Sequence, residues 1–336
     1  MLTKEEKKEQ DLKKHHAQYS PERIFDLSGH PEIKGLDFSK AVDLDALTKS
    51  FLLTGFQATN LGRAIETVKT MRQEKATIIL TFTSNMITSG IRDIITWLVR
   101  HKHVDAIVTA AGGIEEDIIK SLKPFVLGDF HVPGKMLFEK GINRTGNIFV
   151  PNDRFAYFEK FIEPILDEMY TAQKKGTVHS TCDLIKKLGE AIHKEDSYLY
   201  WAAKNKIPVF CPGITDGSLG DMIFFQKQRH KDFVLDVSRD IYDLVTFCLN
   251  ARKTGAIILG SGIAKHFTLN ANIFRGGLDY CVYITTAEEF DGSDSGARPD
   301  EAITWGKIKP DGFSVKVSAD ATIAFPILVA ATFAKE

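Results

Sequence analysis

The stretch "ATIILTFTSNMITSGIRDIITWLVRHKHVDAIVTA", residues 76–110, contains two short apolar runs, 76–82 and 104–110. Between them lies "IRDIITWLVR" (91–100), whose isoleucines and Leu98 recur at i, i+3, i+4 and i+7, the spacing of one helix face. The two apolar runs are nearly continuous rather than alternating, which is typical of parallel strands buried on both faces. The stretch therefore predicts a strand, a helix and a second, parallel strand.

Similar apolar runs recur along the rest of the chain, and helical patterns separate most of them. The further predicted strands are "IPVFCP" (207–212), "GAIILG" (255–260), "YCVYITT" (280–286) and "VKVSAD" (315–320). The predicted helices include 59–73, the segment opening at "IEEDIIKSL" (114–122), three patterns between 154 and 206, and one with Val234, Val237, Ile241, Leu244, Val245 and Cys248 on one face. This alternation predicts an α/β fold with a doubly wound, mostly parallel sheet and helices on both faces, a Rossmann-like architecture.

Length and composition fit a globular protein with one large α/β domain or two smaller ones. The chain has 336 residues, 43% of them apolar, and 43 Lys+Arg against 44 Asp+Glu leave no net basic field that would favour nucleic acid as a partner. No repeat or linker interrupts it, so we expect a single α/β catalytic domain over 21–336. Residues 1–20 are densely charged and contain "TKEE" (3–6), which resembles a capping box. They predict a solvent-exposed helical extension or a frayed tail, with docking onto another subunit as the alternative.

Cysteine spacing and hydropathy bear on metal sites and location. The four cysteines, Cys182, Cys211, Cys248 and Cys281, form no C-x-x-C pair, and no H-E-x-x-H motif occurs, so we expect no metal site and reduced core thiols. The N-terminus is charged rather than apolar, and the longest apolar stretch (321–334) contains a proline and falls short of the roughly 20 residues of a membrane span. We therefore predict a cytoplasmic protein with no membrane partner.

The segments that follow the strands are rich in glycine, small hydroxyl residues and acids. In doubly wound sheets ligands bind at these strand exits, where small residues let backbone N–H groups approach a phosphate. Ser84, Asn85, Thr88, Gly112 and Gly113 suit that role. None of these strand exits alone identifies a cofactor site. "GSGIAKH" (260–266) lacks the third glycine of G-x-G-x-x-G and also fits an ordinary tight turn.

Other exits carry candidate chemistry with equally ordinary explanations. "TDGSLGD" (215–221) contains Asp216 and Asp221, and either acid could instead serve turns and helix caps. His266 opens a predicted helix, where a histidine serves as a cap or packing residue or, near neutral pH, as a base.

The segment 287–307, "AEEFDGSDSGARPDEAITWGK", is the clearest local asymmetry in charge. Its six carboxylates surround a single arginine, Arg298, and repel one another unless a cation is present. Lys307 ends the segment two residues after Trp305, and a lysine attacks a carbonyl or imine only when its amine is neutral. Acids for ammonium groups and an amine beside an indole together indicate a linear polyamine substrate, with a solvated acidic loop as the alternative.

Five motifs resemble those of the deoxyhypusine synthase family. They are "TGFQATNLGRA" (54–64), "TSNMITSGIR" (83–92), "AAGGIEED" (110–117), "TDGSLGDMIFF" (215–225) and, most specifically, "AEEFDGSDSGARPDEAITWGK" (287–307). The resemblance covers the chain from about residue 35 to its end. It implies an enzyme that uses NAD to oxidise spermidine and forms an imine on a lysine with release of 1,3-diaminopropane. The aminobutyl group then passes to a lysine of the precursor of eukaryotic translation initiation factor 5A.

The resemblance also implies residue roles. Lys307 would form the imine and His266 would accept the proton. The polyamine would meet Glu116, Asp221, Gly292, Ser293, Asp294, Glu301 and Trp305. NAD would meet Ser84, Asn85, Thr88, Gly112, Asp216, Ser261, Thr286, Ala287, Asp320 and Ala321. The family forms homotetramers with active sites between paired subunits, and its N-terminal helix can cover a neighbour's site entrance.

Two positions depart from the family pattern. Ser261 stands in what is usually a run of three glycines, which bears on the fit of the cofactor phosphates, and Phe267 replaces a second histidine often seen after His266. Three other functions stay open at this point. They are a regulatory subunit that has lost a catalytic residue, a synthase that uses a free diamine as acceptor to give homospermidine, and an unspecified NAD enzyme.

Overall fold

The structure, a computed structural model, describes residues 3–16 and 26–334 and has a six-stranded parallel sheet at its centre. The strands lie side by side in the order β11-β10-β9-β1-β2-β7. When the six strands are numbered 1 to 6 along the chain, the sheet reads 6-5-4-1-2-3 from one edge and 3-2-1-4-5-6 from the other. This is the 3-2-1-4-5-6 order of dinucleotide-binding folds. The doubly wound prediction is confirmed. The strands are β1 (Thr77–Phe82), β2 (Ala106–Thr109), β7 (Val209–Phe210), β9 (Thr254–Leu259), β10 (Leu278–Thr285) and β11 (Ile308–Ser318).

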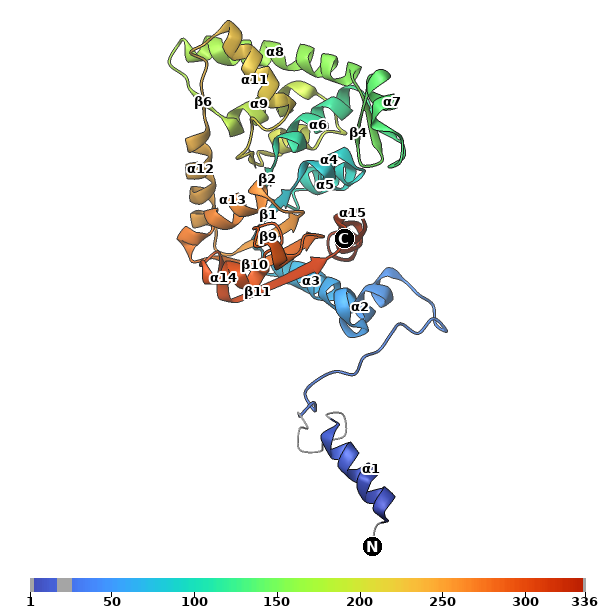
Figure 1. The fold of residues 1–336 in the computed structure, drawn as a ribbon. Coiled ribbons are helices and arrows are strands. Elements are labelled where there is room, and N and C mark those ends of the chain that lie inside the picture. The colour runs from blue at the N-terminus through green and yellow to red at the C-terminus, as the bar shows by residue number, and fades with distance from the viewer. Residues whose placement is uncertain (1–2, 17–25, 335–336) are drawn as a thin grey trace.

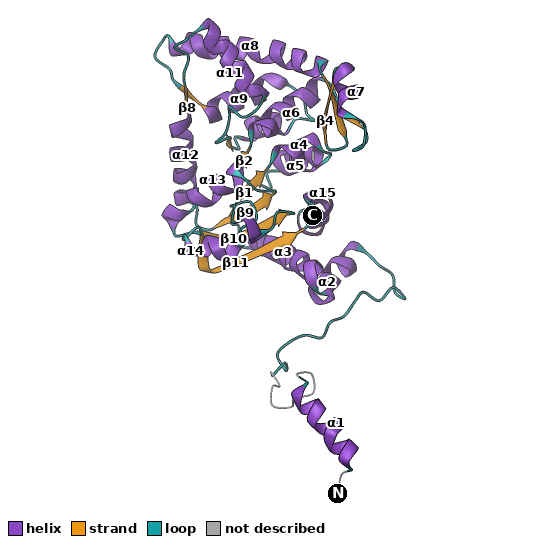
Figure 2. Ribbon diagram, in the orientation of Figure 1, coloured by secondary structure: helices purple, strands orange, loops and turns teal. Residues whose placement is uncertain are grey.

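Helices cover both faces of the sheet (Figures 1 and 2). On one face pack α12 (Val237–Asn250), α13 (Ile263–Ala271) and α14 (Pro299–Thr304). On the other pack α3 (Phe56–Gln73), α5 (Ile91–Arg100) and α15 (Ala321–Thr332). The remaining helices of the body are α2 (Leu44–Thr54), α4 (Ser84–Thr88), α6 (Ala111–Leu122), α7 (Gly134–Glu139), α8 (Asp153–Gln173), α9 (Thr181–Ile192), α10 (Tyr198–Asn205) and α11 (Ser218–Arg229).

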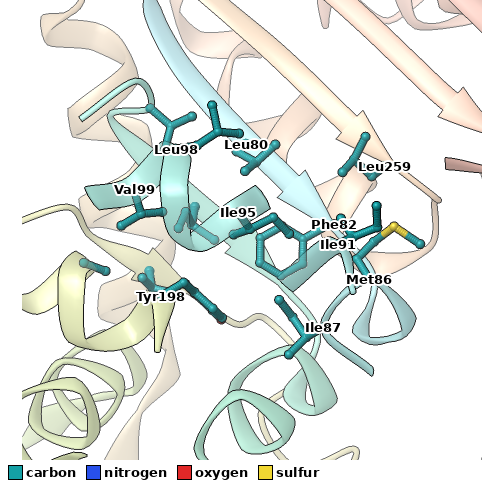
Figure 3. Close-up of a cluster of buried hydrophobic side chains, with 14 of the residues drawn as sticks. Leu80, Phe82, Met86, Ile87, Ile91, Ile95, Leu98, Val99, Tyr198 and Leu259 are labelled. Carbon is teal, nitrogen blue, oxygen red and sulfur yellow. The ribbon is translucent and has the colours of Figure 1, made fainter. Parts of the chain in front are cut away.

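Successive residues of β1 supply both hydrophobic layers. Leu80 and Phe82 are buried in the cluster drawn in Figure 3, together with Ile91 and Ile95 of α5, whereas Ile79 faces the layer with α12 and α13. The ring of Phe82 meets Tyr198 edge to face at a centroid distance of 5.7 Å. Full burial of one such side chain contributes about 1.5–3 kcal/mol. Burial on both faces explains why these strands read as continuous apolar runs.

Several elements differ from the sequence prediction. The structure adds a three-stranded antiparallel sheet, β3 (Val126–Leu127), β5 (Ile148–Pro151) and β4 (Ile142–Thr145), and a short parallel pair, β6 (His179–Ser180) and β8 (Leu235–Asp236). Strand β11 begins seven residues before its predicted start. Val234 lies outside α12, and on the predicted apolar face of that helix Val237 is 57% exposed while Leu244 and Cys248 are buried. That face is therefore only partly a core face.

The N-terminal segment forms α1 (Lys4–His15), which stands apart from the body in Figure 1. Its N-cap is the expected capping box, in which Thr3 and Glu6 bond reciprocally. The side chains described from Thr3 to Lys13 are exposed, and part of the predicted 1–20 extension lies outside the described residues. In the described part of the chain, none of the helices has both the length and the apolar content that crossing a bilayer requires.

The four thiols lie in or near the core. Cys211, Cys248 and Cys281 are buried, Cys182 is partly buried, and none is in a disulfide. Burial raises the pKa of Cys182 and Cys248 to about 11 and that of Cys211 and Cys281 to about 12. Such thiols are protonated at neutral pH and act as small apolar side chains.

Candidate active site

The carboxyl ends of five neighbouring strands bring most predicted cofactor residues to one edge of the sheet. Ile284 of β10 is in register with Leu259 of β9, Leu259 with Phe82 of β1, and Phe82 with Thr109 of β2. The residues that follow these strands therefore lie side by side: Ser84 and Asn85, Gly112, Ser261, and Thr286 with Ala287. Asp320 and Ala321 follow β11 at the same edge, where Ala319 N donates to Thr285 O at 3.2 Å.

The exits of β1, β2 and β9 are in close contact. A Cβ on Gly112 would lie 2.6 Å from the Cβ of Ser84, and a Cβ on Gly260 would lie 2.5 Å from Thr83 Oγ1. Gly260 also has a φ of 79°, a conformation that favours glycine. The first residues of α6 and α13 have no side-chain cap, so backbone N–H groups at these two helix starts lack a side-chain partner at the edge where β2 and β9 end. Ser261 lies in the turn before α13.

Two further predicted residues, one for the cofactor and one for the substrate, lie on α4 and α6. Thr88 is buried on α4 and its hydroxyl donates a hydrogen bond to Glu116 Oε2 on α6. Burial raises the pKa of Glu116 from 4.5 to about 7, against the opposing effect of the Thr88 hydrogen bond. Lys120, one turn further along α6, donates to the carbonyls of Ile87, Thr88 and Ser89 at 2.8–3.1 Å and so clasps the C-terminal end of α4.

Asp216 and Asp221 lie on either side of the N-terminus of α11. Both side chains are exposed, and the loop that carries them adjoins α6, because Glu115 Oε2 accepts a hydrogen bond from Leu219 N at 2.7 Å. The same loop adjoins α13, since a Cβ on Gly213 would lie 3.7 Å from a carbon of Ile263. Asp320 caps α15, where its side chain accepts from Thr322 N at 2.8 Å.

Lys307 and His266 meet on the face of the sheet that α13 and α14 cover. Lys307 Nζ lies 3.1 Å from His266 Nε2, and Lys307 is 8% exposed. Trp305, the C-cap of α14, is 66% exposed and its ring centre lies 5.9 Å from Lys307 Nζ. His266 Nδ1 is 3.0 Å from Asn270 Nδ2, one helical turn further along α13. A buried amine is therefore in contact with a ring nitrogen that can exchange a proton with it.

The place of Lys307 differs from the expectation for a strand-exit ligand. The residue directly precedes β11 and so lies at the amino end of that strand, while its side chain reaches α13. The pocket beside it contains three other predicted residues, Asp294, Glu301 and Trp305, and none from α4, α6 or α11. Gly292 and Ser293 lie on the exposed loop before Asp294. One chain therefore presents the predicted residues as two groups.

Two of the six carboxylates in the acidic segment are paired with cations of the chain itself, Lys316 and Arg298. Lys316 Nζ lies 3.8 Å from Glu289 and 4.0 Å from Glu288, and Arg298 also pairs with Glu289. A bound cation is therefore not needed to hold these two acids. Asp294 and Glu301 remain beside the Lys307 pocket, and Asp294 Oδ2 is buried without a hydrogen-bond partner among the described residues.

Lys265 is a charged residue of this pocket that the sequence analysis missed. It is 2% exposed and its amine donates to the carbonyls of Asp294 and Ala297, the latter at 3.2 Å. Its Nζ also lies 3.9 Å from Asp294 Oδ2 and 4.7 Å from the ring centre of Tyr283. Lys265 therefore ties the acidic loop to α13. The sequence indicated Lys265 only through its position next to His266 on a predicted helix, and that position does not reveal its partners.

Comparison with known proteins gives the family. The family model for deoxyhypusine synthase matches residues 46–332. The chain belongs to the deoxyhypusine synthase family. The deoxyhypusine synthase of Senecio vernalis is 52% identical over 330 residues, covering 90% of this chain and 89% of the relative. That of Arabidopsis thaliana is 50% identical over 331 residues, with 90% of each chain covered.

A solved structure agrees with the assignment. A crystal structure from Entamoeba histolytica, provisionally named a deoxyhypusine synthase, superposes with a TM-score of 0.67 at 32% identity and covers 90% of this chain and 97% of its own. The stretch matched by the deoxyhypusine synthase model includes every candidate site residue from Ser84 to Ala321, whereas α1 lies outside it. The resemblance seen in the five motifs is confirmed.

Proposed function

We propose that this protein is an active deoxyhypusine synthase that transfers the aminobutyl group of spermidine, through an imine on Lys307, to a specific lysine of the precursor of eukaryotic translation initiation factor 5A. The contact of the Lys307 amine with His266 at 3.1 Å, beside Trp305 and within the family's most specific motif, carries the proposal. A regulatory copy that lacks a catalytic residue is disfavoured because Lys307, His266 and Trp305 are all present.

The proposed roles follow from the positions of the side chains. His266 accepts the proton released when spermidine is oxidised, at the carbon of its butyl arm next to the secondary nitrogen, to an imine. The Lys307 amine adds to that carbon, the bond to the secondary nitrogen breaks, and 1,3-diaminopropane leaves. The acceptor lysine then displaces Lys307 from the new imine, which frees the enzyme amine. The final imine is reduced to deoxyhypusine, so oxidation and reduction balance over the cycle.

The carboxyl edge of the sheet fits NAD. The uncapped N-termini of α6 and α13 and the close approach of the β1, β2 and β9 exits suit the cofactor phosphates. NAD supplies the acceptor and donor of the hydride when it is bound. Ser84, Asn85, Thr88, Gly112, Asp216, Ser261, Thr286, Ala287, Asp320 and Ala321 would hold it, and Ser261 would contribute its backbone N–H where the family usually has glycine.

The carboxylates proposed for spermidine are divided between the two groups of residues. Asp294, Glu301 and Trp305 lie beside Lys307, with Gly292 and Ser293 on the loop before Asp294, whereas Glu116 lies on α6 and Asp221 on α11. A homotetramer with active sites between paired subunits would allow the groups of two chains to meet. Exposed apolar side chains on α12 and after α13 support such an assembly, among them Val237, Tyr242, Leu249 and Phe274 at 52–70% exposure. We propose a cytoplasmic enzyme.

The first test is a mass spectrum of the purified protein after incubation with spermidine and NAD and reduction with borohydride. An aminobutyl adduct on Lys307 is expected. Lys307→Ala should give no adduct, and Lys309→Ala serves as the matched control because Lys309 pairs with Asp279 through its own amine, at 2.5 Å. No adduct in a protein that binds NAD would contradict the proposal and favour the regulatory subunit.

The acceptor is tested separately by the product. Incubation with spermidine, NAD and either the factor 5A precursor or putrescine should give deoxyhypusine on the protein acceptor. Homospermidine as the main product would assign the same lysine chemistry to a free diamine instead.

A further inference from the structure

The N-terminus of α11 is capped by a side chain from another helix. Its own N-cap residue, Gly217, has no side chain to offer. Glu115 of α6 fills that place, with Oε2 2.7 Å from the N–H of Leu219, the second residue of the helix. N-cap side chains ordinarily accept from this position or the next one. Glu115 is 8% exposed, so its carboxylate is nearly enclosed by the loop that it caps.

The loop is shaped around this carboxylate. A Cβ on Gly217 would lie 2.7 and 2.9 Å from the two carboxylate oxygens of Glu115, so only glycine leaves room for them. A Cβ on Gly220 would lie 2.1 Å from Thr215 O, which shows how tightly the segment is wound. Asp216 directly precedes the cap, and the N–H of Asp221 bonds to Gly217 O at 3.3 Å. The positions of both aspartates thus depend on the capped turn.

Stabilisation of the fold alone does not explain why a buried glutamate at position 115 caps α11. Burial raises its pKa, the hydrogen bonds from the backbone of Leu219 and Ser218 oppose that shift, and the charges of Asp221 and Asp216 add to it. A carboxylate placed in the interior beside two other acids costs folding free energy. A helix is ordinarily capped by the side chain of its own N-cap residue, which carries no such cost. Local rules of this kind are broken mostly at functional sites.

We propose that Glu115 is a positioning residue of the synthase, which caps α11 from α6 and thereby holds Asp216 and Asp221 in place for the cofactor and the polyamine. The inference rests on the proposed function. It gives the two neighbouring acids of α6 separate contacts: the partly buried Glu116 contacts Thr88 of α4, and the buried Glu115 fixes the N-terminus of α11. Helix α6 thereby sets the spacing of the residues that its two neighbours contribute.

The test compares Glu115→Gln with Glu115→Ala in the full-length protein. Glutamine keeps an oxygen that can accept from Leu219 N, whereas alanine removes it. We expect Glu115→Ala to raise the KM for spermidine by about tenfold or more with a smaller change in kcat, and Glu115→Gln to stay within about twofold of wild type in both. Glu190→Ala on the solvent side of α9 is the matched control.

Hydrogen exchange read by mass spectrometry gives a second readout that needs no catalysis. In Glu115→Ala, amides in the peptide spanning 213–225 should exchange about tenfold faster, while those of α8 stay unchanged. Unchanged exchange there, or an unchanged KM beside a lowered Tm, would overturn the inference. A glutamine variant as impaired as the alanine variant would also overturn it, by showing that the charge acts directly. Faster exchange in Glu115→Ala, together with a wild-type protein that makes no product, would instead refute the proposed function and leave the capping role of Glu115 intact.

Discussion

At the scale of single residues, Glu116 couples the candidate site to pH. Its folded-state pKa of about 7 lies above the ordinary value of 4.5, so between these values the native state holds a proton that the unfolded state has lost. The free energy of unfolding therefore falls as pH rises through this window and levels off above about pH 7. Glu116→Gln should remove this contribution. Between pH 4.5 and pH 8, the free energy of unfolding of the variant should therefore rise relative to that of wild type by up to about 3 kcal/mol.

Urea unfolding of both proteins from pH 4.5 to 8 measures the effect. Glu190→Gln, on the surface of α9, is the control, and its difference from wild type should not vary across this range. Parallel pH profiles for wild type and Glu116→Gln would show that Glu116 is already ionised at low pH in the native state.

The sequence was informative about residues where chemistry requires a particular side chain. Lys307 and Trp305 could be chosen because a nucleophilic amine needs a partly dry environment, whereas the choice of His266 depended on the family resemblance; Lys307 contacts both of them. Lys265 could not be chosen, because its partners are carbonyls of Asp294 and Ala297 about thirty residues away. Backbone acceptors leave no mark in the side-chain pattern.

At the scale of elements, the five-residue helix α4 depends on α6. Lys120 supplies three hydrogen bonds to the last carbonyls of α4, and Lys120→Met would leave these carbonyls without a donor. We expect a loss of about 1–3 kcal/mol in the free energy of unfolding. The KM for NAD should rise as well, because Ser84, Asn85 and Thr88 lie on this helix.

Urea unfolding and steady-state kinetics measure the two effects. Lys123→Met is the matched control, since Lys123 follows at the same helix end but makes an exposed ion pair with Asp153 and a contact with the Tyr157 ring instead of bonds to α4. An equal decrease in the free energy of unfolding in both variants would mean that the three hydrogen bonds from Lys120 to α4 do not stabilise the protein.

Elements that are buried on both sides were predictable, and those that depend on partial burial were not. All six strands of the main sheet were found as apolar runs. The first half of β11 was missed because Pro310, Asp311 and Gly312 interrupt its pattern. The β4–β5 hairpin was missed because its side chains are half exposed, although the two-residue turn Gly146–Asn147, with Gly146 at a φ of 59°, was an available signal.

At the scale of the whole molecule, we propose that α1 is an extension outside the catalytic domain. The described side chains of this helix are exposed, and the family match begins only at residue 46. Deletion of residues 1–25 should therefore shift the Tm by less than about 2 °C. Differential scanning calorimetry of the full and shortened chains is the measurement, and a drop of several degrees would place the segment within the folded domain.

The position of Trp305 gives the enzyme an optical reporter of its own reaction. The chain has three tryptophans, and Trp201 is 8% exposed while Trp97 is half-buried against the rings of His101 and His103. Trp305 is 66% exposed and faces the Lys307 amine, so the long-wavelength part of the indole fluorescence comes mainly from the wall of the reaction pocket. Spermidine binding and formation of the proposed adduct on Lys307 can therefore be tested in real time by emission, without a label.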